Sequence, residues 1–239
     1  MDTIKIRKNN AKMIAHRGLS GIETENTAAA FIAAGNRSYW GIECDVYRSA
    51  DGKFVVFHDG STGRLADRDC KIEETPYDIL KDLTLYDTDG SGPRNHIRIS
   101  TLNDYTSICK KYGKRCVIEL KSAFAKRDIE KIINEIISFD YLDRVIFISF
   151  NLQNLLYARE LLPEQAIQYL VGERKEDLIG ILTGNRFDVD IHISFLNKEV
   201  INEFKTNNIA VNCWTCDDPE RAEELVNMGV DMITTNILE

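Results

Sequence analysis

The chain has 239 residues, of which 44% are hydrophobic and 28% are charged, and its formal net charge at pH 7 is −8. This length can bury a sizeable core, and we expect one domain over residues 1–239. The negative charge argues against a nucleic-acid binder, because affinity for phosphate backbones depends on lysines and arginines. No apolar run approaches the roughly 20 residues of a membrane span, so we expect a cytoplasmic protein without an integral membrane segment.

Short runs rich in valine and isoleucine alternate with longer segments of helical periodicity, as in repeated βα units around a parallel sheet. The expected strands cover residues 13–15, 41–46, 54–57, 116–120, 145–149, 166–170, 189–193, 209–214 and 231–234. The expected helices cover residues 25–35, 101–112, 126–138, 151–161, 173–182, 197–207 and 218–228. Helix starts are predicted at Ser100 or Thr101, at Asn151 and at Asp218, and helix ends at Gly113 and Gly229.

Nine strands are one too many for an eight-stranded barrel. The link from Val46 to Phe54 is too short for a parallel crossover, and it contains the turn signal Asp51-Gly52. We therefore interpret residues 54–57 as the return arm of a hairpin after the second strand. The sequence predicts a (β/α)8 TIM barrel with this hairpin excursion and with an insertion at about residues 60–99, where the repeat is broken.

Charged side chains follow strand periodicity at two places. Glu43 and Asp45 are two residues apart and project to the same side of their strand, as do Glu119 and Lys121. The flanking residues are apolar, which favours burial, and buried carboxylates are costly unless a cation neutralises them. We therefore predict that Glu43, Asp45 and Glu119 bind a hard divalent metal, Mg²⁺ or Ca²⁺.

Two of the four histidines, His16 and His58, lie at strand ends beside a charged neighbour, and this position favours a catalytic role. His96 lies in the insertion, and His192 is expected to be a core or rim group. Cys213 and Cys216 form a C-x-x-C pair inside a strand-like run. We expect them to pack in the barrel, because no second pair stands at zinc-site spacing.

Taken together, these residues resemble the motifs of the glycerophosphodiester phosphodiesterases. That family has an H-R-G motif after its first strand, and this chain has His16, Arg17 and Gly18. Further matches in chain order are Glu25-Asn26-Thr27, Glu43 with Asp45-Val46, Asp51-Gly52, Val55-Val56, His58-Asp59, Glu119 with Lys121, Ser149-Phe150 and Trp214-Thr215. The resemblance covers almost the whole chain.

The chain departs from the family pattern at a few positions. Thr24 stands where the family usually has proline, which we expect to loosen that turn. Asn236 and Ile237 replace the usual aspartate and proline after the last strand, so contacts of the final loop differ from the pattern. Cys216 is also atypical for its loop.

The resemblance implies metal-dependent hydrolysis of a glycerophosphodiester, a small-molecule substrate, to glycerol 3-phosphate and an alcohol. Arg17 and Lys121 would bind the phosphate, and Trp214 would contact the glycerol carbons. His16 and His58 would act as general base and general acid, both titrating near neutral pH. The pattern leaves open which histidine is the base, whether water or a glycerol hydroxyl attacks, which metal binds, which alcohol leaves and how many subunits assemble.

Two other functions fit parts of the pattern. One is a different phosphodiesterase on the same barrel, resembling lysophospholipase D enzymes or phosphatidylinositol phospholipases. The absence of an apolar membrane-binding loop counts against it. The other is a non-catalytic barrel that binds a phosphate ligand, but no charged group that the chemistry needs is missing here.

Overall fold

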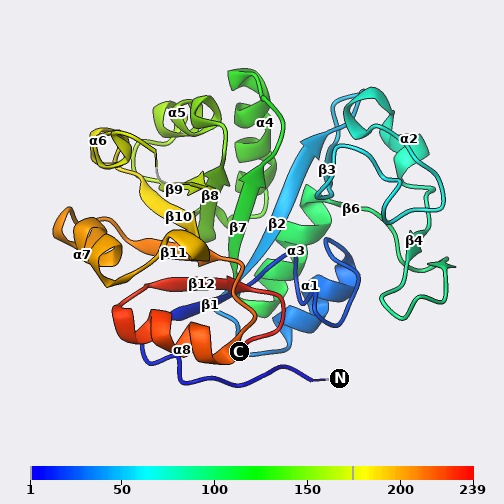
Figure 1. Cartoon of the computed structure of the whole chain (residues 1–239). Coiled ribbons are helices and arrows are strands. Elements are labelled where there is room, and N and C mark those ends of the chain that lie inside the picture. Colours follow the sequence, from blue (N-terminus) through cyan, green and yellow to red (C-terminus); the bar gives the residue numbers. More distant parts are fainter. Residues whose placement is uncertain (1, 174) are drawn as a thin grey trace.

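A computed structural model of the chain, which describes residues 2–173 and 175–239, contains a closed barrel of eight parallel strands surrounded by helices (Figure 1). The barrel strands are β1 (Lys12–Ala15), β2 (Gly41–Arg48), β7 (Arg115–Leu120), β8 (Val145–Ser149), β9 (Ala166–Val171), β10 (Asp188–His192), β11 (Val211–Trp214) and β12 (Met232–Thr235). Strand β1 pairs with both β12 and β2, which closes the sheet. The predicted TIM barrel is confirmed.

The main helices are α1 (Ala28–Gly35), α3 (Leu102–Tyr112), α4 (Lys126–Ile137), α5 (Leu152–Leu161), α6 (Leu178–Asn185), α7 (Lys198–Thr206) and α8 (Pro219–Met228). The predicted cap residues Thr101, Asn151 and Asp218 accept backbone hydrogen bonds at the starts of α3, α5 and α8. Gly113 and Gly229 close α3 and α8 with left-handed backbone conformations.

Two helices begin later than predicted. Helix α1 starts at residue 28 instead of 25, because Asn26 has a left-handed backbone (φ 58°) and Thr27 is the N-cap. Helix α6 starts at residue 178 instead of 173, after Asp177 at φ 56°. A left-handed residue cannot continue a right-handed helix, so each one fixes a boundary that periodicity alone does not show.

The hairpin prediction is also confirmed. Strand β3 (Phe54–Val56) runs antiparallel to β2, with Val46 opposite Val56, and β6 (Ser100–Thr101) pairs with β3 in turn. Between β3 and β6 lie short elements that the sequence did not predict: η1 (Ile72–Glu74), α2 (Tyr77–Leu80), and the two-stranded pair β4 (Leu85–Tyr86) and β5 (Pro93–Arg94). This segment lies beside β3 at one side of the barrel (Figure 1) and packs around its own apolar cluster, which includes Phe57, Ile72 and Leu80.

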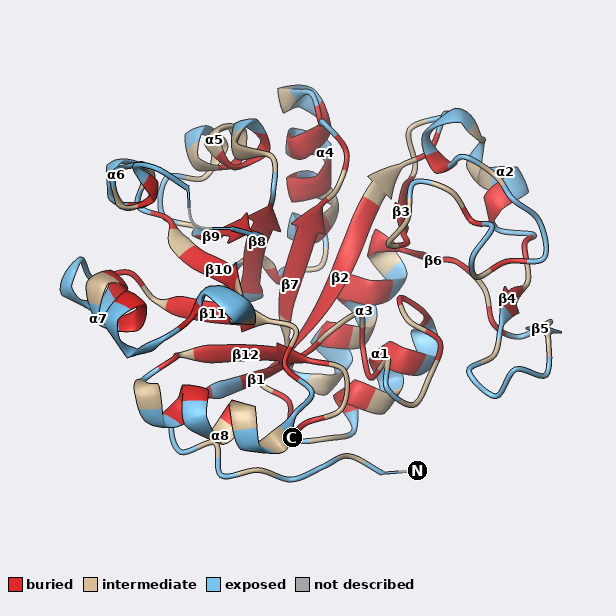
Figure 2. Cartoon of the chain, in the orientation of Figure 1, coloured by how far each residue is buried: buried red, intermediate tan, exposed pale blue. Residues whose placement is uncertain are grey.

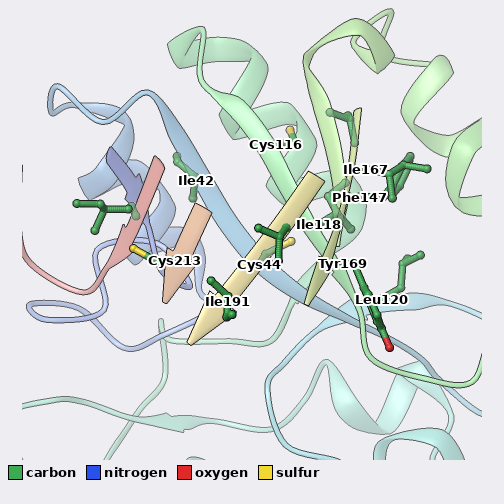
Figure 3. Packing of buried hydrophobic residues seen from close by; sticks show 14 of the residues in the cluster. Ile42, Cys44, Cys116, Ile118, Leu120, Phe147, Ile167, Tyr169, Ile191 and Cys213 are labelled. Atoms are coloured by element: carbon green, nitrogen blue, oxygen red, sulfur yellow. The ribbon is translucent and has the colours of Figure 1, made fainter. Parts of the chain in front are cut away.

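The largest apolar cluster lies between the barrel strands and the helices, where the strands are buried and the outer helix faces are exposed (Figure 2). Cys44, Ile118, Leu120 and Cys213 point into this layer (Figure 3). Cys216 is buried in it as well, and both cysteines of the C-x-x-C pair are free thiols, as the packing interpretation predicted. Within the described residues, no helix has the length and apolar character needed to cross a lipid bilayer.

Candidate active site

A pocket opens at the carboxyl ends of the barrel strands, where side chains of TIM barrels face the βα loops. Its lining residues are His16, Arg17, Glu43, His58, Glu119, Lys121, Ile148, Phe150, Leu170, Asp190, Trp214 and Thr234. Seven of the eight predicted site residues are in this lining. The eighth, Asp45, is buried beside it and forms ion pairs with Arg17 and Lys121. The fold therefore brings all eight together from strands β2, β7 and β11 and from the residues that follow β1, β3 and β7.

Strand alternation builds the acidic cluster. Glu43 and Asp45 face the barrel interior while Cys44 packs outward, and Glu119 enters from the neighbouring strand β7, where it pairs with Asp45 in register. Carboxylate oxygens of Glu43, Asp45 and Glu119 lie within 4.8 Å of one another, and all three residues are buried.

The three carboxylates compete for the available positive charge. Burial favours the neutral acid at Asp45, but Lys121 and Arg17 outweigh it and hold its pKa below the ordinary value. Burial and the charge of Asp45 raise the pKa of Glu43 well above its ordinary value, and they raise the pKa of Glu119 to about 8. The cluster thus carries more acidic groups than the protein's own cations neutralise.

Arg17 and Lys121 lie directly on this cluster. The Lys121 ammonium is 3.2 Å from Glu119 and 3.4 Å from Asp45. Arg17 has a left-handed backbone (φ 54°), from which its amide donates to Glu43 at 2.8 Å. Next to it, Gly18 (φ 79°) leaves no room for a side chain, because a Cβ there would be 2.7 Å from Ala30. This tight turn explains why the H-R-G run needs its glycine.

His16 is held by a chain of polar groups from the last loop. Its Nδ1 lies 2.8 Å from Oδ1 of Asn236, whose Nδ2 donates to Asp217 at 2.6 Å. Because the NH₂ group of Asn236 donates to Asp217, its oxygen faces His16 and accepts a hydrogen bond from the Nδ1–H group, which leaves Nε2 of the neutral ring as an acceptor. Asn236, a departure from the family pattern, thus fixes the His16 tautomer.

The electrostatics correct one expectation about His16. Burial and the neighbouring charge of Arg17 lower the pKa of His16 to about 4, so the ring is neutral at pH 7 instead of titrating there. The sequence does not reveal this shift, because it depends on the desolvation of the closed barrel mouth.

His58 is oriented by the segment that follows it. Its Nδ1 lies 2.8 Å from Oδ1 of Asp59, and Arg64 donates to the other oxygen of Asp59 at 2.6 Å. Arg64 also donates to both oxygens of Glu25, and Glu25 accepts from Arg17 at 2.9 Å. Sequence reasoning missed Arg64, a half-exposed residue of the insertion that links Asp59 to Glu25, because no motif or periodicity marks it.

Thr24 corrects another expectation. Instead of loosening its turn, this buried residue donates its hydroxyl hydrogen bond to the carbonyl of Tyr86 at 2.8 Å and so ties the turn to the insertion.

Trp214 forms an aromatic wall at the mouth. Its ring meets Phe150 and His192 edge to face, with centroids 5.5 and 5.0 Å apart. His192 is therefore a rim group, as predicted. Phe150, which is exposed, adds to this wall. In the sequence, Phe150 belongs to a family motif, but it was not predicted to have a role in the site.

Comparison with known proteins identifies the family. The model of the glycerophosphoryl diester phosphodiesterase family matches residues 16–239. A glycerophosphodiester phosphodiesterase from Caldanaerobacter subterraneus subsp. tengcongensis is 29% identical over 231 residues, which cover 94% of this chain and 93% of that protein.

Two solved structures agree with the fold. A phosphodiesterase from Oleispira antarctica, solved with the product sn-glycerol 3-phosphate, is 30% identical, with a TM-score of 0.83 and coverage of 94% of this chain and 92% of the other. A glycerophosphodiester phosphodiesterase from Parabacteroides distasonis is 30% identical, with a TM-score of 0.80 and coverage of 96% and 94%. The chain therefore belongs to the glycerophosphoryl diester phosphodiesterase family, a family of phosphoric diester hydrolases.

Proposed function

We propose that this enzyme hydrolyses glycerophosphodiesters to glycerol 3-phosphate and an alcohol, with a divalent metal and two histidines. One observation carries the proposal: a cluster of three buried carboxylates adjoins a pocket that is lined by two cations and two separately oriented imidazoles. Cleavage of a phosphodiester requires charge neutralisation at phosphorus and proton transfer at the entering and leaving oxygens, and this set of groups can provide both.

The acidic cluster fits a hard divalent cation. Its oxygens lie within 4.8 Å of one another, and the raised pKa values of Glu43 and Glu119 reflect burial first and the neighbouring carboxyl groups second. Mg²⁺ and Ca²⁺ both prefer such oxygen ligands. When bound to Glu43, Asp45 and Glu119, the metal would supply positive charge for a phosphoryl oxygen.

The protein's own cations would bind the phosphate beside that position. Arg17 offers a planar guanidinium, which Glu25 and Asp45 hold from two sides, and such a group can donate two parallel hydrogen bonds to a phosphate. Lys121 adds a compact charge from β7. Both would stabilise the charge on phosphorus-bound oxygens in the transition state.

The hydrogen bonds around the histidines suggest how their roles divide. His16 is neutral with Nε2 as its acceptor nitrogen, which suits a general base that takes the proton of the attacking oxygen. His58 has the Asp59 carboxylate on Nδ1, which orients its ring and suits a general acid for the leaving alcohol. Asp59 in turn is held by Arg64.

A substrate panel tests the proposal. The purified enzyme is assayed for release of glycerol 3-phosphate from glycerophosphocholine, glycerophosphoinositol and a long-chain lysolipid, each with Mg²⁺ or Ca²⁺. We expect turnover of the soluble diesters to exceed turnover of the lysolipid. Turnover of the lysolipid alone would assign the enzyme to the lysophospholipase D class, and binding without turnover would indicate a ligand-binding barrel.

A further inference from the structure

Asp190 is a buried acid of the pocket to which the mechanism above gives no role. It lies in the middle of β10, between Val189 and Ile191, which pack outward against the helices. Strand alternation therefore turns Asp190 into the barrel, where it lines the same pocket as the predicted site residues. Only 1% of the residue is exposed.

One oxygen of the Asp190 carboxyl group, Oδ1, is buried without a hydrogen-bond partner among the described residues. The in-register neighbour of Asp190 on β9 is the apolar Leu170, and Ile148 and Trp214 add apolar surface to the same pocket. A buried polar atom without a partner is costly, and in a ligand pocket such an atom is a natural contact for the ligand.

The protonation state of the Asp190 carboxyl group also suits an uncharged ligand group. Burial, and then the negative charge of Glu119, raise the pKa of Asp190 well above its ordinary value. A neutral carboxyl both donates and accepts a hydrogen bond, as does a hydroxyl group. It would not compete with the acidic cluster for the metal.

We propose that Asp190 is a specificity-determining residue that binds a hydroxyl group of the glycerol moiety. The inference rests on the proposed function, which places the phosphate at Arg17 and Lys121. The indole of Trp214 donates to the backbone carbonyl of Asp190 at 3.3 Å, so the aromatic face and the carboxyl belong to one wall. Glycerol carbons packed on that face would direct a hydroxyl to Asp190.

Ligand binding tests this role without relying on turnover. Calorimetric titrations with saturating Mg²⁺ compare the wild type with Asp190→Leu and Asp190→Asn, using glycerol 3-phosphate, propyl phosphate and inorganic phosphate. Propyl phosphate has the carbon chain but no hydroxyl. We expect Asp190→Leu to lower the affinity for glycerol 3-phosphate about 10-fold, which is the effect of one lost buried hydrogen bond. The affinities of this variant for propyl phosphate and for inorganic phosphate should stay within about two-fold of the wild-type values.

Asp190→Asn is the matched control, because its amide also donates and accepts. The affinities of Asp190→Asn for all three ligands should stay within about three-fold of the wild-type values. If Asp190→Leu does not fold, Asp190→Ala, which adds no bulk, takes its place.

Two results would overturn the role of Asp190: unchanged selectivity for glycerol 3-phosphate in Asp190→Leu, or an equal loss for all three ligands. A wild type that binds glycerol 3-phosphate no more tightly than phosphate would contradict the proposed function as well.

Discussion

Replacing Glu119 by glutamine should stabilise the metal-free protein while destroying its response to metal. Glutamine has nearly the same shape as the Glu119 side chain, but it cannot ionise. In the folded wild type its pKa is about 8, against an ordinary value of 4.5. The folded state therefore holds a proton that the unfolded state releases between pH 4.5 and 8, and the free energy of unfolding falls as pH rises through that window.

The magnitude follows from this difference in proton binding. Each pH unit above the ordinary pKa lowers the free energy of unfolding of the wild type by about 1.4 kcal/mol. At pH 7 the total decrease is up to about 3 kcal/mol, and the glutamine variant does not undergo it. At pH 5 the gap should be less than about 1 kcal/mol. For a chain of this size, 3 kcal/mol corresponds to a rise in Tm of roughly 6 to 12 °C.

Urea unfolding at pH 5 and pH 7, with EDTA or with Mg²⁺, measures both effects. In EDTA at pH 7, Glu119→Gln should unfold at higher urea than the wild type. In excess Mg²⁺ the order should reverse or the gap close, because only the wild type keeps the full ligand set. Glu130→Gln, an exposed change on α4, should alter stability by less than about 0.5 kcal/mol in every buffer. A Glu119→Gln protein that is less stable than the wild type in EDTA, by the same amount at both pH values, would refute the reasoning.

Three further predictions concern the groups around the acidic cluster. His16→Ala and His58→Ala should each lower kcat by roughly 10² to 10⁴ with little change in Tm, and wild-type turnover in either variant would remove that histidine from the mechanism. Asn236→Asp places a carboxylate beside His16 Nδ1 and should raise the pKa of the ring. The acidic limb of the pH profile of kcat/KM should then move to higher pH by about one unit. A limb that does not move would exclude His16 as the base. Arg64→Ala should lower kcat/KM about 10-fold through its loss of contact with Asp59, and an unchanged value would show that the insertion does not position His58.

The sequence was sufficient for the groups that strand periodicity controls. Glu43 and Asp45 share the barrel face because a strand repeats every two residues, and the short link between Val46 and Phe54 excludes a parallel crossover. The same rule applied to β10 would have placed Asp190 in the interior, so that residue was within reach of sequence reasoning.

The contacts made by loops could not be predicted in the same way. Arg64 reaches Glu25 across 39 positions of the chain, and Asn236 reaches His16 across 220. No local pattern encodes such pairings, because they depend on how the closed barrel brings its loops together. The neutral state of His16 follows from the same closure.

The most direct test of the central claim is which bond the enzyme cleaves. Phosphorus NMR of sn-glycero-3-phosphocholine, incubated with the enzyme and Mg²⁺ or Ca²⁺, distinguishes the two possible phosphate products. We predict glycerol 3-phosphate and free choline, with no reaction in EDTA and recovery when the metal is restored. Phosphocholine and glycerol as products, or full turnover in EDTA, would contradict the account.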